Sequence, residues 1–214
     1  MPVFDLTRPI HPDMPVFPGS EQPSVSLVYD YAAYGYRESQ LCLSSHCGTH
    51  MDPPAHFYPG LPTLDQIPPD RFVGMALCLD CSHLPPGASA SMDQVRPHQN
   101  LADQASYLIF NMGWAKYWGQ AEYFGDYPVI GNDVAEYMLR SGKKALGVDT
   151  VSIDRIKEVE YPLHRALLQG GILIIENLCN LENLGGKFFT LVAAPLKISD
   201  SDGAPTRVLA MIRN

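Results

Sequence analysis

Short apolar and alternating stretches along the chain predict strands more often than helices. These stretches are rich in Val, Ile, Leu and Tyr, which favour the pleated backbone of a sheet. They cover Val25–Tyr31, Gln40–Ser45, Phe72–Asp80, Tyr107–Met112, Lys144–Asp149, Gly171–Glu176, Phe188–Ile198 and Thr206–Ile212. Strand is therefore the commonest predicted element.

Three segments instead carry helical signals, and all of them lie in the second half of the chain. They are Ala115–Phe124, Asn132–Arg140, with Asn132 as the expected N-cap, and Pro162–Gln169. The second half thus alternates strand and helix as in βαβ units, whereas the first half consists of strands and loops punctuated by proline. This order predicts a mixed α/β protein.

The composition is that of an ordinary globular protein. Of 214 residues, 46% are hydrophobic and 18% are charged, and we see no repeat or Gly/Ser linker, so we expect one domain over residues 1–214. The formal net charge of −8 argues against nucleic acid and anionic membranes as partners. The N-terminus does not resemble a signal peptide, and no apolar run approaches the roughly 20 residues that span a bilayer, so we expect a cytoplasmic location.

The five cysteines are odd in number and lie mostly in apolar segments, which indicates reduced core thiols. Cys78 and Cys81 form a C-x-x-C, a spacing also found in redox pairs and zinc sites. Here the pair lies in a predicted strand that runs into a turn, and the chain has no second C-x-x-C. We therefore favour core thiols here too.

Three histidines and an aspartate crowd into eleven residues: His46, His50, Asp52 and His56. A helix would also bring His46 and His50 together, but Gly48 and a following Pro-Pro pair disfavour one. In an extended segment all four side chains point to the same side. We expect that arrangement, with Gly48 leaving room for an ion or a substrate.

Imidazole nitrogens and a carboxylate oxygen suit Zn²⁺, Mn²⁺ or Fe²⁺, and three protein ligands leave a coordination position for water. The alternative is that each histidine caps a turn or fills a gap in the core. For four such side chains on one side of a segment we favour a metal site.

A second cluster follows near the C-terminus. His164 falls in the first turn of the predicted helix, and Glu176 ends an apolar strand. If Glu176 is buried there, its charge needs a metal or a cation as a partner. The alternative is that its side chain reaches solvent. Asp149 also ends a predicted strand, but a turn or a helix cap is its more common role.

The histidine segment resembles the H-x-G-T-H-x-D-x-P-x-H signature of the cyclase-like metal-dependent hydrolases, a family that includes bacterial kynurenine formamidases and isatin hydrolases. The resemblance continues in Asp5-Leu6-Thr7, in Phe17-Pro18-Gly19, in the stretch from Gly147 to Asp154 and in the stretch from His164 to Leu178. It therefore covers nearly the whole chain.

The resemblance implies a swivelling β/β/α domain with a mixed sheet, usually assembled as a homodimer or homotetramer. It implies one or two ions per subunit, Zn²⁺ or Mn²⁺, and it makes His56 the catalytic acid/base. The implied metal ligands are His46, His50 and Asp52 for one ion, and Asp52, His164 and Glu176 for a second.

The activity that the resemblance implies is hydrolysis of an amide or formamide C–N bond by metal-bound hydroxide, as in an arylformamidase acting on an N-formylkynurenine-type substrate. A lactam hydrolase of the isatin hydrolase type, a cyclase or a lactonase is the alternative, and a non-catalytic metal-binding protein is another. Phe17, Phe57 and Trp114 are candidates to bind an aromatic or cyclic small molecule. Phe17, Val151 and Asn111 depart from residues common in relatives, and this leaves the particular substrate open.

Overall fold

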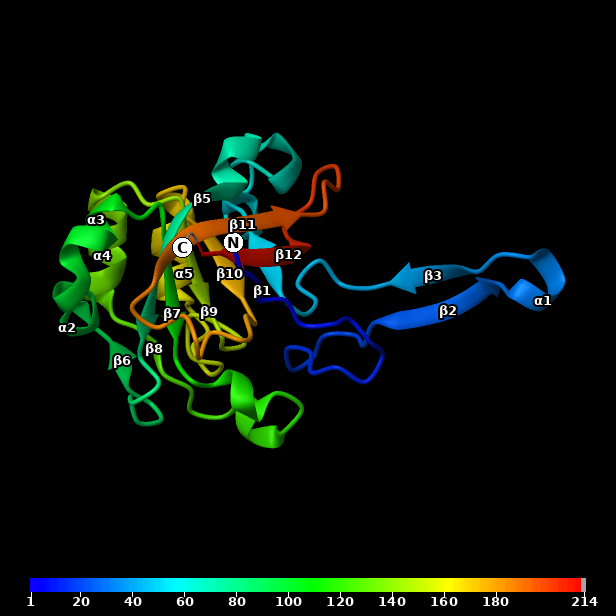
Figure 1. Ribbon diagram of the computed structural model, residues 1–214, viewed down its shortest axis with the longest axis horizontal. Helices are drawn as coiled ribbons and strands as arrows, with labels where there is room; N and C mark the ends of the chain where they lie inside the picture. Colours follow the sequence, from blue (N-terminus) through cyan, green and yellow to red (C-terminus); the bar gives the residue numbers. More distant parts are fainter. Residues whose placement is uncertain (213–214) are drawn as a thin grey trace.

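The computed structural model describes residues 1–212 and contains a central sheet with helices beside it (Figure 1). Its strands are β1 Val3–Asp5, β2 Ser24–Tyr29, β3 Glu38–Cys42, β4 His50–Asp52, β5 Val73–Asp80, β6 Ser89–Ala90, β7 Tyr107–Asn111, β8 Val129–Ile130, β9 Ala145–Val148, β10 Leu173–Glu176, β11 Phe188–Pro195 and β12 Ala204–Met211. Its α-helices are α1 Tyr31–Tyr34, α2 Met92–Val95, α3 Gln99–Gln104, α4 Asn132–Arg140 and α5 Pro162–Gln169. Short 3₁₀ turns cover Pro54–His56, Leu64–Gln66, Pro69–Phe72, Arg96–His98, Ala115–Tyr117 and Ala121–Phe124.

The main sheet closes on itself. Its strand order is β1-β12-β11-β5-β7-β9-β10-β4, and β4 also pairs with β12, so that within residues 1–212 seven strands form a barrel-like ring. The strands β5, β7, β9 and β10 are parallel, and the remaining neighbours are antiparallel. The predicted fold class, α/β with a mixed sheet, is confirmed.

Two hydrophobic clusters lie on the two faces of this sheet. Side chains of alternate residues in a strand point to opposite faces. In β5, Leu77 and Leu79 pack into the cluster that contains helix residues such as Val134 of α4 and Leu167 of α5. Ala76, one position away, faces the other cluster, which is formed by the strands of the ring. The parallel strands are therefore buried on both faces, which explains their continuous apolar runs.

Each predicted strand has a counterpart in the structure, and two of the three predicted helices form with the predicted bounds, α4 and α5. The helix predicted over Ala115–Phe124 is wrong: this segment forms two separate 3₁₀ turns. Gly119 lies between them with φ of 83°, a left-handed conformation that ends helical geometry. The expected cap is also shifted by one residue, because Gly131 is the N-cap of α4 and Asn132 begins the helix.

Residues 24–42, which we call the arm, project away from the rest of the molecule (Figure 1). The arm consists of β2 and β3, which pair antiparallel, and of the short helix α1 at its tip. Its residues are exposed except Tyr29, which is half-buried. Residues 1–212 contain no helix long and apolar enough to cross a membrane.

Candidate active site

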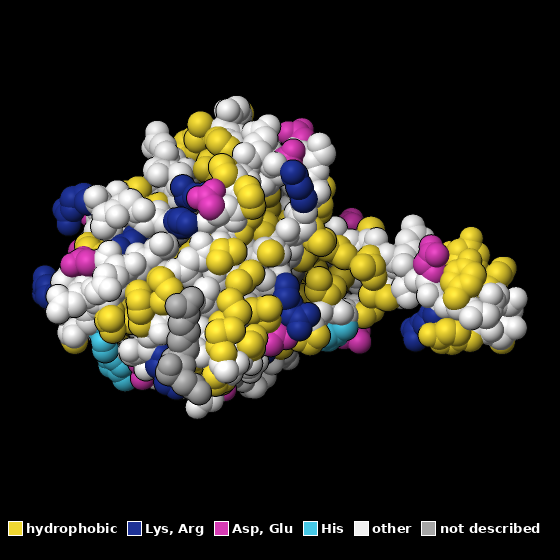
Figure 2. Space-filling model, turned by 45° about the horizontal axis from the view of Figure 1, so that its top comes forward, with side chains coloured by type: hydrophobic (Ala, Val, Ile, Leu, Met, Phe, Trp, Pro, Cys, Tyr) yellow, Lys and Arg dark blue, Asp and Glu magenta, His cyan; other side chains and the backbone are white. Residues whose placement is uncertain are grey.

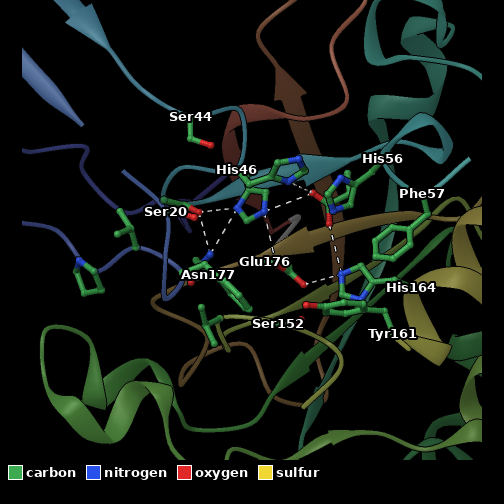
Figure 3. A pocket seen from close by; sticks show the side chains of 17 residues that line it. Ser20, Ser44, His46, His56, Phe57, Ser152, Tyr161, His164, Glu176 and Asn177 are labelled. Carbon is green, nitrogen blue, oxygen red and sulfur yellow. Dashed lines mark hydrogen bonds and ion pairs between the residues drawn. The ribbon is translucent and has the colours of Figure 1, made fainter. Parts of the chain in front are cut away.

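The six predicted ligand and acid/base residues line one cavity of about 330 Å³. Figure 3 shows the rings of His46, His56 and His164 and the carboxylate of Glu176 around a common centre. The remaining two, His50 and Asp52, lie on β4. Residues that are about 120 positions apart in the sequence are thus brought together.

Pairing of β4 with β10 explains much of this convergence. The two strands are antiparallel, and His50 lies directly opposite Glu176 in their register. Asp52 is two residues further along β4 and so projects to the same side as His50. Helix α5 begins at Pro162 and supplies His164 in its first turn, as predicted.

The backbone from His46 to His56 differs from the extended segment predicted. Only His50–Asp52 is a strand, and residues 54–56 form a 3₁₀ turn that begins at Pro54. Gly48 lines the cavity, and its conformation is also constrained. It has φ of 62°, and a Cβ at this position would lie 3.0 Å from Met14 Cε, so the position requires glycine for a turn.

Asp52 lies at the centre of the cluster and is 1% exposed. Its Oδ1 is 2.8 Å from His46 Nδ1 and 3.4 Å from His50 Nε2, and its Oδ2 is 3.8 Å from His164 Nε2. Burial would raise the pKa of this carboxyl, but the charges of His50 and His46 outweigh burial and hold the pKa below its ordinary value. Asp52 therefore remains an anion in a buried position.

Glu176 has the partners that a buried carboxylate needs. Its Oε1 lies 3.3 Å from His164 Nε2, its Oε2 lies 3.5 Å from His50 Nε2, and Oε1 accepts a hydrogen bond from the Ile153 N–H. The prediction that this strand-end carboxylate is buried beside a cation or a metal site is consistent with these contacts, since an unpaired buried charge is costly.

His50 is held in one ring orientation. Its Nδ1 lies 2.8 Å from the carbonyl oxygen of Gly48, which can only accept, so Nδ1 carries the proton and Nε2 faces the carboxylates. Asn177 donates to the same carbonyl and accepts a hydrogen bond of 2.7 Å from the Tyr123 hydroxyl. The free nitrogen of His50 is thus directed into the cavity by a buried network.

His164 is oriented by a residue that the sequence analysis did not single out. Its Nδ1 lies 2.8 Å from Asp154 Oδ2, which directs Nε2 toward Asp52 and Glu176. Burial disfavours the protonated ring, yet the hydrogen bonds to Asp154 and Glu176 prevail and raise the pKa of His164 to about 10. Asp154 belongs to the stretch from Gly147 that resembles the family, which is the one signal that pointed to it.

Asp202 is a second residue that the sequence analysis missed. Its carboxylate lies 3.2 Å from His46 Nε2 and 3.7 Å from His56 Nδ1. Burial of His46 opposes protonation, but Asp52 and Asp202 together raise the pKa of this ring to about 10. A lone aspartate in a loop of the sequence carries no pattern that would have indicated this contact.

His56 and its neighbour His46, which is 22% exposed, are the more accessible rings of the cluster. The side chain of His56 is 27% exposed, against 4% for His50 and 5% for His164. Its ring packs on His46 with the centroids 4.0 Å apart. Burial lowers the pKa of His56 below its ordinary value. The neighbouring rings of His46 and His164 lower this pKa further, and the Asp52 carboxylate raises it by less than burial lowers it. A neutral imidazole at the cavity surface is suited to accepting a proton.

The donor atoms fit a divalent metal. Two sets offer ligand atoms within 4.8 Å of one another, His46 with Asp52 and His56, and His50 with Asp52 and Glu176. Asp52 belongs to both sets, and its buried Oδ2 has no hydrogen-bond partner among the described residues. Such an orphaned anionic oxygen among imidazoles is the environment that a metal ion would complete.

These geometric sets do not coincide with the ligand sets that the family resemblance implies. Without an ion, His56 groups with His46 and Asp52, and His164 belongs to neither set. His164 Nε2 nevertheless lies within 3.8 Å of an oxygen of Asp52 and of Glu176. The assignment of individual ligands stays a prediction.

Of the aromatic candidates, Phe17 and Phe57 line the cavity and Trp114 does not. Trp114 is 7% exposed and packs in the core, where its Nε1 donates to the carbonyl oxygen of Tyr123. The structure therefore corrects the expectation that Trp114 contacts a substrate in this cavity. Phe57 also stacks on the ring of His164, with centroids 5.3 Å apart.

The remaining polar candidates have structural roles. Asp149 is fully buried and accepts hydrogen bonds from the N–H groups of Met112, Trp114 and Ala115, so it stabilises a turn, as expected. The five cysteines are free thiols, and burial raises the pKa of Cys81 to about 12, which makes it unreactive.

Comparison with known proteins agrees with the fold and with the motif. The model of the Cyclase family, described as "Putative cyclase", matches residues 4–155. An uncharacterised protein of Methanocaldococcus jannaschii is 31% identical over 213 residues, which are 99% of this chain and 100% of that protein. The chain belongs to the cyclase family, and the resemblance seen in the sequence is confirmed.

Several relatives have names that describe an activity, including the following two. Kynurenine formamidase of Bacillus thuringiensis is 27% identical over 208 residues, which cover 96% of this chain and 95% of that enzyme. The solved structure of isatin hydrolase A from Labrenzia aggregata, bound to benzyl benzoate, has a TM-score of 0.87 and 25% identity. It matches 100% of this chain and 94% of that chain. Both relatives are hydrolases, and both match over nearly their whole length.

Proposed function

We propose that this protein is a metal-dependent hydrolase of non-peptide C–N bonds, and that the cavity around Asp52 is its active site. The observation that carries the proposal is the buried Asp52 carboxylate, which lies among four imidazoles and a second carboxylate. Its Oδ2 lacks a hydrogen-bond partner among the described residues. The hydrolase names of the relatives support the same reaction class.

His46, His50 and Asp52 would hold one ion, and Asp52, His164 and Glu176 would hold a second; Zn²⁺ and Mn²⁺ both suit these donors. A divalent ion bound there supplies Lewis acidity: it lowers the pKa of water and polarises a carbonyl group. Asp154 fixes the ring of His164, and the Gly48 carbonyl fixes the ring of His50, so the ligand nitrogens are held in place beforehand.

His56 is the proposed acid/base. Its ring is partly exposed to the cavity, and its lowered pKa keeps it neutral near pH 7. In hydrolysis it would accept the proton of the attacking water on a ring nitrogen and pass it to the leaving nitrogen of the amide, after which the ring is neutral again. No side chain needs to act as a nucleophile in this scheme.

The proposed substrate is an amide or formamide attached to an aromatic or cyclic group. Phe17 and Phe57 provide aromatic surface beside the histidines, suited to stacking on a flat ring. An N-formylkynurenine-type substrate fits this description. A cyclic amide of the isatin type is the second candidate, which the likeness to isatin hydrolase A favours.

A substrate panel tests the proposal. The purified protein, with its metal content measured by elemental analysis, is assayed on N-formylkynurenine, isatin and simple lactones. We expect hydrolysis of one of the two C–N substrates, loss of activity with a chelator, and recovery on addition of Zn²⁺ or Mn²⁺. Metal-loaded protein that hydrolyses only lactones, or nothing in the panel, would contradict the proposal.

The remaining expectations extend this proposal. We infer a single domain over residues 1–214, of which residues 213–214 lie outside the described part, and a homo-oligomer, dimer or tetramer. The cytoplasmic location stays a prediction.

A further inference from the structure

Tyr161 has a backbone conformation that is unusual for its residue type. Its φ of 48° and ψ of 55° are left-handed, and it is the residue directly before α5. Pro162 disfavours the right-handed helical conformation for the residue that precedes it. A glycine would adopt the left-handed conformation without the strain that a Cβ causes. A tyrosine at this position indicates that its side chain has a role of its own, since strained residues are concentrated at functional sites.

The side chain of Tyr161 forms part of the wall of the proposed active-site cavity. Its ring meets the ring of His164 edge to face, with centroids 6.0 Å apart, and its centroid lies 5.5 Å from that of Phe57. Figure 3 shows Tyr161 next to His164, on the same side of the cavity as Phe57. Tyr161 therefore lies beside both a proposed metal ligand and a proposed aromatic contact of the substrate.

The hydroxyl of Tyr161 has no partner among the residues that line the cavity. No dashed line reaches it in Figure 3, and its side chain does not cap α5. Other tyrosines of this region use their hydroxyls within the protein: Tyr123 donates to Asn177 Oδ1, and Tyr58 donates to the carbonyl oxygen of Arg165. The hydroxyl of Tyr161 is thus available to a bound molecule.

The cavity has few other donors on this side. Ser152 Oγ already accepts from the Asp154 N–H, and Ser20 and Ser44 lie across the cavity from Phe57 (Figure 3). Lysine and arginine side chains are scattered over the face drawn in Figure 2, but none lines the cavity in the described part of the chain. A neutral hydroxyl beside aromatic rings suits an uncharged acceptor such as a carbonyl oxygen.

We propose that the Tyr161 hydroxyl donates a hydrogen bond to a carbonyl oxygen that the substrate carries on its aromatic ring, ortho to the amide nitrogen. This inference rests on the proposed function and narrows its substrate class from aryl amides in general to ortho-acyl aryl amides. Both candidate substrates contain this group: N-formylkynurenine has a ketone ortho to its formamide, and isatin has a ketone ortho to its lactam nitrogen. The scissile carbonyl would be polarised at the metal site, so the second carbonyl needs a donor of its own. Tyr161 thus orients the substrate and takes no part in proton transfer.

Two formamides that differ only in an ortho acetyl group test this inference. Formanilide lacks the group, and N-formyl-2-aminoacetophenone has it. We would measure kcat and KM for both on the metal-loaded wild type and on Tyr161→Phe, which removes the hydroxyl and keeps the ring beside His164 and Phe57. Tyr58→Phe is the matched control, because it removes a hydroxyl that donates to the Arg165 carbonyl and does not line the cavity. Metal content and melting temperature check that both variants are folded and loaded.

We expect Tyr161→Phe to raise KM for the acetyl-bearing formamide about 3- to 10-fold, the effect of losing one neutral hydrogen bond. The ketone is not the reacting group, so the bond is made equally in the ground state and the transition state and kcat should stay nearly unchanged. KM for formanilide should be the same in the wild type and in Tyr161→Phe, and Tyr58→Phe should alter neither substrate. Equal effects of Tyr161→Phe on the two formamides, or no effect on either, would overturn the inference.

Binding of the two product amines separates this inference from the proposed reaction. Aniline and 2-aminoacetophenone differ by the same acetyl group and bind without hydrolysis, so ligand-observed NMR titrations give their dissociation constants. The wild type should bind 2-aminoacetophenone more tightly than aniline, and Tyr161→Phe should lose that preference. If neither formamide is hydrolysed while this preference depends on Tyr161, the proposed function fails and the hydrogen bond to the ketone stands. A wild type that binds neither amine or both equally, or a preference that survives in Tyr161→Phe, would overturn the inference.

Discussion

The side-chain carboxylate of Asp154 contacts both the backbone N–H and the ring of His164. Oδ2 of the carboxylate accepts a hydrogen bond of 3.0 Å from the His164 N–H and lies 2.8 Å from the ring Nδ1. Oδ1 accepts a hydrogen bond from the N–H of Leu163. One carboxylate thus satisfies the first N–H groups of α5 and sets the direction in which His164 Nε2 points.

Replacing Asp154 with asparagine should weaken metal binding. Asp154→Asn keeps the size of the side chain but removes the anion that orients and polarises His164. We expect the affinity for Zn²⁺ to fall about 10- to 100-fold, as is typical when a partner of a ligating histidine is lost. Competition with a chromophoric chelator measures this affinity directly.

Asp149→Asn is the matched control. Asp149 is buried like Asp154 and accepts three backbone N–H groups, where Asp154 accepts two, but it does not contact a histidine in the described structure. The variant Asp149→Asn should lower the stability of the fold without a comparable loss of metal affinity. Equal metal affinities in the two variants would show that Asp154 has only a structural role.

His56→Ala should separate turnover from metal binding. If His56 moves the proton, kcat should fall about 100- to 10,000-fold on whichever substrate the panel identifies. The metal content should stay near that of the wild type, because His46, His50, Asp52, His164 and Glu176 are intact. A variant that has lost its metal would instead make His56 a ligand, as its proximity to His46 and Asp52 also allows.

The sequence predicted the strands of the sheet well because their apolar runs reflect burial on both faces. It did not predict the closure of the ring. Strand β4 is only His50–Asp52, too short for an alternating pattern, and its pairing with β12 depends on contacts far along the chain. Closure is a property of the whole chain, whereas the pattern of β7 or β9 is local.

The ligand candidates were found for a related reason. His46 to His56 lie close in sequence, so their spacing is visible. His164 and Glu176 were noticed from their positions at the start of a helix and at the end of an apolar strand, and the family resemblance supplied their roles as ligands. Asp202 could not be found in this way, because its role depends on a loop that folds back onto His46. The place of Trp114 in the core could not be predicted, because a tryptophan that binds a ligand and a tryptophan in the core look the same in a sequence.

The metal-free protein should lose stability as the pH rises from about 6.5 to about 10. The pKa values of His46 and His164 are raised from 6.5 to about 10 in the folded chain by the carboxylates beside them. Their contribution to stability is therefore complete below pH 6.5 and is lost as the pH passes through 10. Thermal melts across this range in the presence of a chelator measure the decline.

The metal-loaded protein is the control for this experiment. Metal binding requires deprotonated imidazoles, so the two rings no longer titrate in this window and the melting temperature should vary less. The buried thiol of Cys81 also destabilises the folded chain at high pH, but only above about 9 and in both forms alike. A metal-free melting temperature that is flat or rises between pH 6.5 and 9 would contradict the prediction.

Gly203→Ala should disturb the site by displacing His46. A Cβ at this position would lie 2.6 Å from His46 Cε1, too close for the ring to remain where it contacts Asp52. If His46 is a metal ligand, one added methyl group should lower the metal affinity at least about tenfold, since 1.4 kcal/mol of strain on the ring is sufficient. Gly185→Ala is the control, because its Cβ would contact only Asp80 and no histidine. Unchanged metal affinity in Gly203→Ala, with a wild-type melting temperature, would remove His46 from the ligand set.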